Sequence, residues 1–149
     1  MKARLTFLVL LFSMLFINQS IFAQDQPQKT PTRKVTPAND KLVVLWTSGY
    51  AEVAKKMVYM YTYNAKKNGW WDKITFIIWG PSSKLLAEDK ELQDYLKKMK
   101  DEGVVLEACK ACADMYHVSD KLTELGVDVK YMGQDLTNYI KNEKYIITF

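Results

Sequence analysis

The apolar residues of the chain follow two alternating patterns: short continuous runs, and longer stretches with helical spacing. The runs at 42–46 and 74–79 are too short for helices and are followed by turn residues, so they predict strands that are buried on both faces. The five predicted strands cover residues 42–46, 74–79, 104–108, 127–132 and 145–149.

Between these runs, apolar side chains recur three and four positions apart, which predicts amphipathic helices. Gly69 and Gly103 follow two of these stretches, where a glycine commonly ends a helix, and Pro81 suits the first turn of another. The predicted helices cover residues 51–68, a stretch that opens at Pro81, 91–102, 111–125 with a break near His117, and 136–141.

Strand and helix therefore alternate through residues 41–149, which we expect to form one domain. Parallel neighbours need long crossover connections, and these are almost always right-handed. The pattern predicts an α/β fold with a mainly parallel sheet of about five strands and helices on both faces. In such folds the chemistry gathers at the carboxyl ends of the strands, here the loops 47–50, 80–83 and 109–112. The sequence does not give the strand order, so convergence of the three loops is left open.

The first 40 residues have a different composition. A basic head with Lys2 and Arg4 precedes an apolar run at 5–17, and residues 1–23 end in Ala23. This pattern predicts a secretory signal peptide, and the run is shorter than the about 20 residues that span a bilayer. An uncleaved N-terminal anchor is the alternative. Residues 24–40 hold three prolines and predict a flexible linker. We expect a periplasmic or secreted protein without stable membrane insertion after cleavage.

The charges are nearly balanced, which removes several classes of function. The full chain carries +4, and loss of Lys2 and Arg4 with the signal peptide leaves +2. Nucleic-acid-binding proteins usually carry a basic stripe, whereas the lysines here lie between apolar helix positions, so we expect no nucleic-acid partner. The Gly80-Pro81 stretch is neither a P-loop nor a G-x-G-x-x-G motif, so we expect no nucleotide and no other cofactor.

Both cysteines of the chain, Cys109 and Cys112, lie in the stretch EACKACADMY at a C-x-x-C spacing. Cys109 directly follows a predicted strand and Cys112 lies in the first turn of the next predicted helix. Helical N–H groups and the charge of Lys110 both favour a thiolate. We therefore predict a reactive thiol pair, with the sulfur of Cys109 uncovered at the rim of the sheet.

Two other interpretations of the cysteines stay open at this level. A structural disulfide fits an oxidising compartment, although a ring of four residues stabilises a fold less than a longer loop does. Cys109, Cys112 and His117 also form C-x-x-C-x-x-x-x-H, but a closed zinc site needs four ligands and the chain has no second pair. A covalent haem is excluded because Ala113, rather than a histidine, follows Cys112.

The first helix carries aromatic residues on more than one side, in the run Tyr59-Met60-Tyr61-Thr62-Tyr63. Burial of two faces, by the sheet and by another subunit, predicts a homo-oligomer. Extra core packing with scattered surface aromatics explains the same run.

Three stretches of the domain are similar to a known family. GVVLEACKACADMYHVSDKLTELGVDVKYMG (103–133), IIWGPSSKLL (77–86) and the ending YIITF (145–149) resemble the DsrE/DsrF-like sulfur-relay family, which includes the TusD type of sulfur carrier. The likeness covers about residues 41–149, and its most specific part is the run from Gly103 to Cys109.

The resemblance implies a three-layer α/β/α sandwich that commonly assembles into trimers or hexamers. It also implies that Cys109 accepts sulfur from a donor, carries it as a persulfide and passes the outer sulfur to a partner thiol. The donor and the acceptor would be proteins or small sulfur species. Cys112 has no counterpart in the TusD pattern. A second thiol at this spacing could attack the persulfide and release sulfide. The predicted export also departs from the TusD type, whose relay partners are cytoplasmic.

Overall fold

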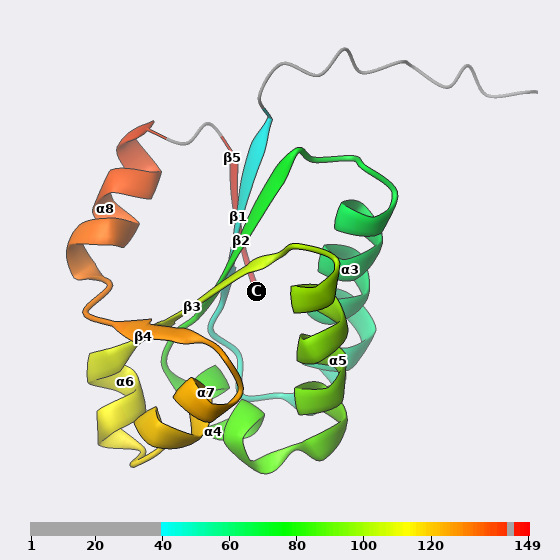
Figure 1. The fold of residues 1–149 in the computed structure, drawn as a ribbon. Helices are drawn as coiled ribbons and strands as arrows, with labels where there is room; N and C mark the ends of the chain where they lie inside the picture. Colours follow the sequence, from blue (N-terminus) through cyan, green and yellow to red (C-terminus); the bar gives the residue numbers. More distant parts are fainter. Residues whose placement is uncertain (1–39, 143–144) are drawn as a thin grey trace, which may run out of the picture. The chain divides into compact units, whose positions relative to one another are not determined.

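The computed structural model of this chain describes residues 40–142 and 145–149, so the predicted signal peptide (1–23) and nearly all of the predicted linker (24–40) lie outside the described residues. Within them, five strands form one sheet in the order β4-β3-β2-β1-β5, and every neighbouring pair is parallel (Figure 1). The strands are β1 (Lys41–Trp46), β2 (Lys73–Ile78), β3 (Val105–Cys109), β4 (Asp128–Lys130) and β5 (Tyr145–Thr148).

Helices fill the connections between successive strands. They are α2 (Ala51–Val53), η1 (Ala54–Val58), α3 (Tyr59–Lys67), α4 (Pro81–Glu88), α5 (Lys90–Asp101), α6 (Lys110–Met115), α7 (Ser119–Glu124) and α8 (Gly133–Asn142). The first three form one continuous helix whose middle, η1, has the wider π-helical hydrogen bonding.

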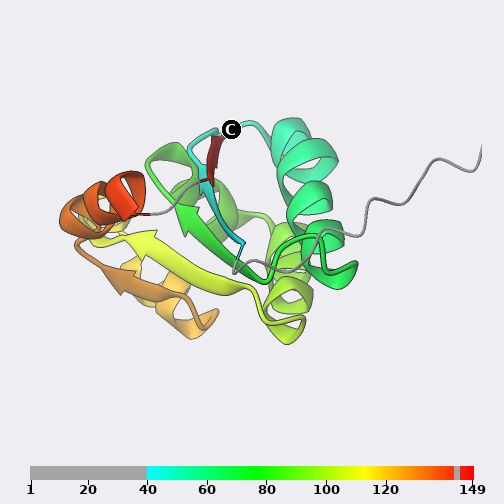
Figure 2. The same ribbon diagram turned by 90° about the horizontal axis from the view of Figure 1, so that it is seen from above.

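The strand order explains how the helices divide between the faces of the sheet. From β1 to β4 each strand is placed beside the previous one in the same direction, so right-handed crossovers put their helices on one face. The step from β4 to β5 runs back across the sheet and puts its helix, α8, on the opposite face. Figure 2 shows α8 and the pair α3 and α5 on opposite sides of the strands. The predicted three-layer α/β/α arrangement is confirmed.

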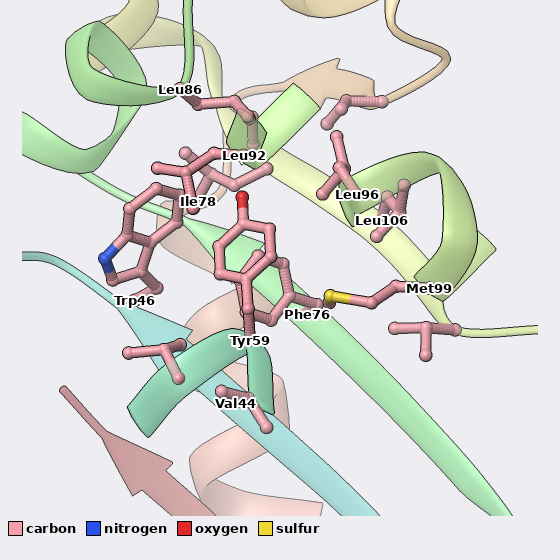
Figure 3. Close-up of a cluster of buried hydrophobic side chains, with 14 of the residues drawn as sticks. Val44, Trp46, Tyr59, Phe76, Ile78, Leu86, Leu92, Leu96, Met99 and Leu106 are labelled. Atoms are coloured by element: carbon pink, nitrogen blue, oxygen red, sulfur yellow. The ribbon is translucent and has the colours of Figure 1, made fainter. Parts of the chain in front are cut away.

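The face that carries α3 and α5 holds the larger core. Trp46, Tyr59 and Phe76 lie at its centre with ring centroids 5.2 to 5.9 Å apart, and all three are fully buried (Figure 3). Leucines from α4 and α5 complete it, because α5 places Leu92 and Leu96 along one apolar stripe. We call this cluster the aromatic core.

The opposite face holds a smaller buried cluster, which we call the thiol cluster. Its buried members are Val43, Ile77, Cys109, Cys112 and Met132. Residues alternate between faces along a strand, so Val43 and Ile77 point here while Val44 and Phe76 point into the aromatic core.

The elements predicted from the hydrophobic pattern are confirmed, with local differences in their bounds. The strand predicted at 127–132 is shorter, because β4 covers only Asp128–Lys130. The predicted break near His117 is present: α6 and α7 are separate, and His117 has a φ of 57° between them. The predicted helix at 136–141 is longer, because it begins at Gly133. The first helix is continuous as predicted, but its π-helical segment gave no signal in the sequence. No helix in the described part of the chain combines the length and apolar character needed to cross a membrane.

Candidate thiol site

The two cysteines lie at the junction of β3 and α6, as the sequence predicts. Cys109 is the last residue of β3 and precedes α6 with an extended backbone (φ −72°, ψ 109°). Cys112 is the third residue of α6, so the helical turn folds it back beside Cys109. The helix has only six residues, and the support that its backbone dipole gives to a thiolate is correspondingly small.

The thiols are covered, in contrast to our expectation that the sulfur of Cys109 is uncovered at the rim. Cys109 is 4% exposed and Cys112 is 7% exposed. Both belong to the thiol cluster, against which Leu136 and Tyr139 of α8 pack. The expectation of an open rim was wrong because it considered the strand end alone, and α8 comes from the far end of the sequence.

Both cysteines are free thiols, and they interact with each other. Burial raises the pKa of the Cys112 thiol, and its hydrogen bond with Cys109 raises that pKa further. A hydrogen bond with the backbone of Gly80 acts on the same pKa in the opposite direction. Burial and the contact with Cys109 both favour the neutral form of the Cys112 thiol.

The contact between Gly80 and Cys112 shows whether the segments 47–50, 80–83 and 109–112 converge. Gly80 lies between β2 and α4, and its backbone contacts Cys112 in α6, which directly follows β3. Ser82, in the first turn of α4, donates to the carbonyl oxygen of Trp46 at 2.7 Å, where β1 ends. The loops after β1, β2 and β3 therefore converge at one edge of the sheet, the lower end of the strands in Figure 1.

Lys110, which we expected to favour a thiolate, is engaged elsewhere. Its ammonium group lies 2.6 Å from a carboxylate oxygen of Asp114, and it sits 5.7 Å from the ring centroid of Tyr131. The Asp114 carboxylate raises the pKa of Lys110. Much of the Lys110 charge is thus compensated on the surface, away from the buried sulfur atoms.

A buried carboxylate beside the thiols was not identified from the sequence. Glu107 lies two positions before Cys109 on the same face of β3 and is also buried. Its carboxylate accepts a hydrogen bond from Lys130 at 3.0 Å and from the hydroxyl group of Tyr139 at 3.0 Å. Burial and the negative charge of Glu107 raise the pKa of Tyr139 to about 12. The signal in the sequence was a single charged residue inside the apolar run VVLEA.

The metal interpretation finds no support in the geometry. His117 is exposed at the turn between α6 and α7, whereas both thiols are buried. Within residues 40–142 and 145–149, no group of three or more histidine, cysteine or acidic side chains could hold a metal ion. Cys109, Cys112 and His117 therefore do not come together as a set of metal ligands.

These features define a class: a parallel three-layer α/β protein with a thiol pair at the carboxyl edge of its sheet. The DsrE/DsrF-like family matches residues 40–149, and the chain belongs to this family, which is generally associated with sulfur relay. No functionally curated protein matches the chain significantly.

Two solved structures are similar to the chain. A conserved protein of unknown function from Bacteroides thetaiotaomicron, BT1422, is 41% identical, with a TM-score of 0.72 over 75% of this chain and 97% of the other. The ychN protein from E. coli is 14% identical, with a TM-score of 0.58 over 74% of this chain and 99% of the other. The second likeness concerns the fold alone.

Proposed function

We propose that this chain is an exported DsrE/DsrF-like thiol protein that accepts, carries or exchanges sulfur through Cys109, with Cys112 as the second thiol. The observation that carries the proposal is the interaction of two free thiols where three loops converge at the carboxyl edge of a parallel sheet. Export is proposed from residues 1–23, and homo-oligomer formation from the half-exposed Met57 and Met60 on the first helix.

In the first step the thiolate of Cys109 attacks the outer sulfur of a donor persulfide, R–S–SH. A sulfur–sulfur bond forms on Cys109, the donor bond breaks, and R–S⁻ leaves with the electron pair. Cys109 then carries a persulfide, and the donor is a free thiolate. Cys112, which is hydrogen-bonded to Cys109, lies beside the reacting sulfur.

The persulfide on Cys109 can react further in two ways, and both reactions balance in atoms and electrons. An acceptor thiolate can attack the outer sulfur, which moves the sulfur to the acceptor and returns Cys109 as a thiolate. Alternatively, Cys112 loses its proton and attacks the inner sulfur, so that hydrosulfide leaves and a Cys109–Cys112 disulfide forms. In that reaction the sulfane sulfur is reduced and two thiols are oxidised, and an external dithiol must reduce the disulfide before the next cycle.

The test is exposure of the fully reduced protein to sodium tetrasulfide, followed by mass spectrometry and an assay for released sulfide. We expect Cys112→Ser to retain one added sulfur atom on Cys109, because the resolving thiol is gone. The wild type is expected to release sulfide and form the disulfide, and Cys109→Ser to take up no sulfur. If Cys109 gains no sulfur in either the wild type or Cys112→Ser, the proposal is wrong.

The low exposure of both cysteines favours one other candidate function. In it, the chain is a non-catalytic oligomeric binding or assembly module, and the thiol pair forms a short structural disulfide. Cys109→Ser would then leave assembly intact and reduce only stability. A protein that assembles normally, forms the disulfide under mild oxidation and shows no sulfur uptake is the expected outcome for this second candidate.

A further inference from the structure

One short part of the chain, residues 132–139, contributes three side chains to the surroundings of the thiol pair. Met132 is fully buried in the thiol cluster, and Leu136 and Tyr139 of α8 pack against that cluster. Met132 directly precedes α8 and its carbonyl oxygen accepts a hydrogen bond from Leu136 at 2.7 Å. The three positions are spaced by four and three residues, so they line up along one side of the start of the helix. We call these three residues the cap. Cys109 and Cys112 are buried in one cluster with Met132, Val43 and Ile77, and Leu45, Trp79 and Ile146 also pack against this cluster.

Polar interactions with Glu107 of β3 and Lys130 of β4 connect the cap and its helix to the sheet. The hydroxyl group of Tyr139 donates to both carboxylate oxygens of Glu107, at 3.1 and 3.0 Å. Lys130 lies 3.0 Å from Glu107 and 3.2 Å from Asp135, which is in the first turn of α8. Glu107 thus connects β3 with both Lys130 and α8, directly next to the strand position of Cys109.

Helix α8, which carries most of the cap, buries little of its surface against the sheet. Helix α8 contains no fully buried residue, and Ile140, one turn after Leu136, is 63% exposed. The helix therefore touches the sheet along the cap and turns its remaining surface outward. A helix with so few buried contacts can admit a small molecule through side-chain movement alone. A larger molecule reaches the thiols only if the helix itself moves.

We infer that the cap restricts the thiol pair to small sulfur species, such as hydropolysulfides and low-molecular-weight persulfides, and keeps out persulfidated cysteines of folded proteins. The inference rests on the proposed function and specifies its substrate class. Transfer requires the donor sulfur to contact the sulfur of Cys109. A donor cysteine on a protein surface brings its own backbone along, and thiols that are 4% and 7% exposed leave no room for it unless the cluster opens.

A first experiment measures access alone, independently of sulfur chemistry. The reduced protein is treated with N-ethylmaleimide or with fluorescein maleimide, which share the reactive group and differ in bulk. We expect the wild type to react much more slowly with the bulky reagent. Leu136→Ala should reduce this discrimination at least about tenfold, because it removes apolar contacts that hold the helix down. Ile140→Ala is the matched control on the same helix and should leave it within about twofold.

Tyr139→Phe provides a second variant in case Leu136→Ala unfolds. It keeps the ring against the cluster, removes only the link to Glu107, and should shift the discrimination in the same direction by a smaller factor. The cap has no selective role if Leu136→Ala, verified as folded, speeds both reagents equally, or if the wild type does not discriminate between them.

The second experiment tests the substrate class with Cys112→Ser as the background, since this variant retains the added sulfur. Sodium tetrasulfide is compared with a carrier protein whose single persulfidated cysteine lies on a rigid helix. We expect loading by tetrasulfide and at least about tenfold slower loading by the protein donor, with the protein donor gaining most from Leu136→Ala. Equal loading by both donors overturns the inference and leaves the proposed function intact. Size discrimination by the maleimides without loading from either donor supports the cap and refutes the proposed function.

Discussion

The two faces of the sheet differ in how much of the chain covers them. One face is covered by the helices of three successive crossovers and holds the aromatic core, with Trp46, Tyr59 and Phe76 in mutual contact. The other face receives the single crossover from β4 to β5, and the cover there is α8 with its cap. The difference follows from the order β4-β3-β2-β1-β5, because one strand placed on the far side of β1 sends one helix to the second face.

This comparison indicates that one face of the sheet mainly stabilises the domain and the other holds its reactive groups. Stability depends on buried apolar area, which the aromatic core supplies in large aromatic and leucine side chains. The thiol face buries fewer large side chains and instead holds the cysteines, a buried carboxylate and a thin cover. Local opening should therefore start on the thiol face, where it exposes the reactive groups without unfolding the domain.

The largest effect is expected for two neighbouring isoleucines of β2. Ile77 and Ile78 are both fully buried, but Ile77 points into the thiol cluster and Ile78 into the aromatic core. We expect Ile78→Ala to lower the free energy of unfolding by about 4 kcal/mol and Ile77→Ala by about 2 kcal/mol, since the thinner cover can collapse onto the smaller side chain. Urea unfolding of both variants measures these values.

The reactivity of the cysteines in the same two variants provides a second test of the comparison. Ile77→Ala should speed the alkylation of the cysteines under native conditions, while Ile78→Ala should leave it unchanged at concentrations of urea where both remain folded. Equal losses of stability together with equal alkylation rates would show that the two faces are equivalent, and the comparison would fail.

The second prediction concerns the buried carboxylate. Glu107→Gln keeps the shape of the side chain but removes the charge that pairs with Lys130. We expect a loss of about 1 kcal/mol in the free energy of unfolding at neutral pH, less than for a fully buried pair because Lys130 is partly exposed and keeps Asp128 and Asp135. Glu88→Gln on α4 is the surface control and should change little, as its contact with Lys84 is long and exposed. An identical effect of the two substitutions in urea unfolding contradicts the assignment.

The third prediction uses the hydroxyl group of Tyr139. Its pKa is raised from 10.0 to about 12 in the folded protein, so the folded state holds this proton more tightly than the unfolded state does. The contribution to stability is complete below pH 10 and is lost as the pH rises from 10 to 12. The difference in melting temperature between the wild type and Tyr139→Phe should be constant below pH 10 and shrink above it. Tyr59 and Tyr95 also have raised pKa values, but they are present in both proteins and cancel. A difference that stays constant up to pH 12 would refute the Glu107 link.

The sequence predicted most of the fold because the central strands β1 and β2 are mainly apolar runs and α5 has a clear apolar stripe. The run Ile74 to Trp79, for example, reads as a strand buried on both faces, and β2 is buried on both faces. The order of the strands was not predictable, since pairing depends on tertiary contacts that leave no local periodicity. The position of α8 on its own face depends on that order.

The site was predictable only in part for a related reason. Placement of Cys109 at a strand end and Cys112 in the next helix follows from local pattern. Their cover does not, because Met132 and Leu136 become neighbours of the thiols only when the last crossover folds back over the sheet. Glu107 was visible as a charge in an apolar strand, but its partners come from β4 and α8, and nothing local connects Lys130 or Tyr139 with it.

The smallest effect is expected on the acidity of Cys112 itself. Burial is the larger cause of its raised pKa, and the hydrogen bond with Cys109 is the next. Cys109→Ala removes the bonding partner and should lower the pKa of Cys112, yet leave it above the ordinary value of 9.0 because the cover remains. Cys109→Ser leaves a hydroxyl oxygen that can still accept the bond, so its Cys112 should titrate at a higher pH than in Cys109→Ala. Both variants contain one cysteine, and the pH dependence of N-ethylmaleimide alkylation therefore reports Cys112 alone. Coincident titration curves would show that the two sulfur atoms do not interact, and a pKa at or below the ordinary value in both would show that the thiol face is open to water.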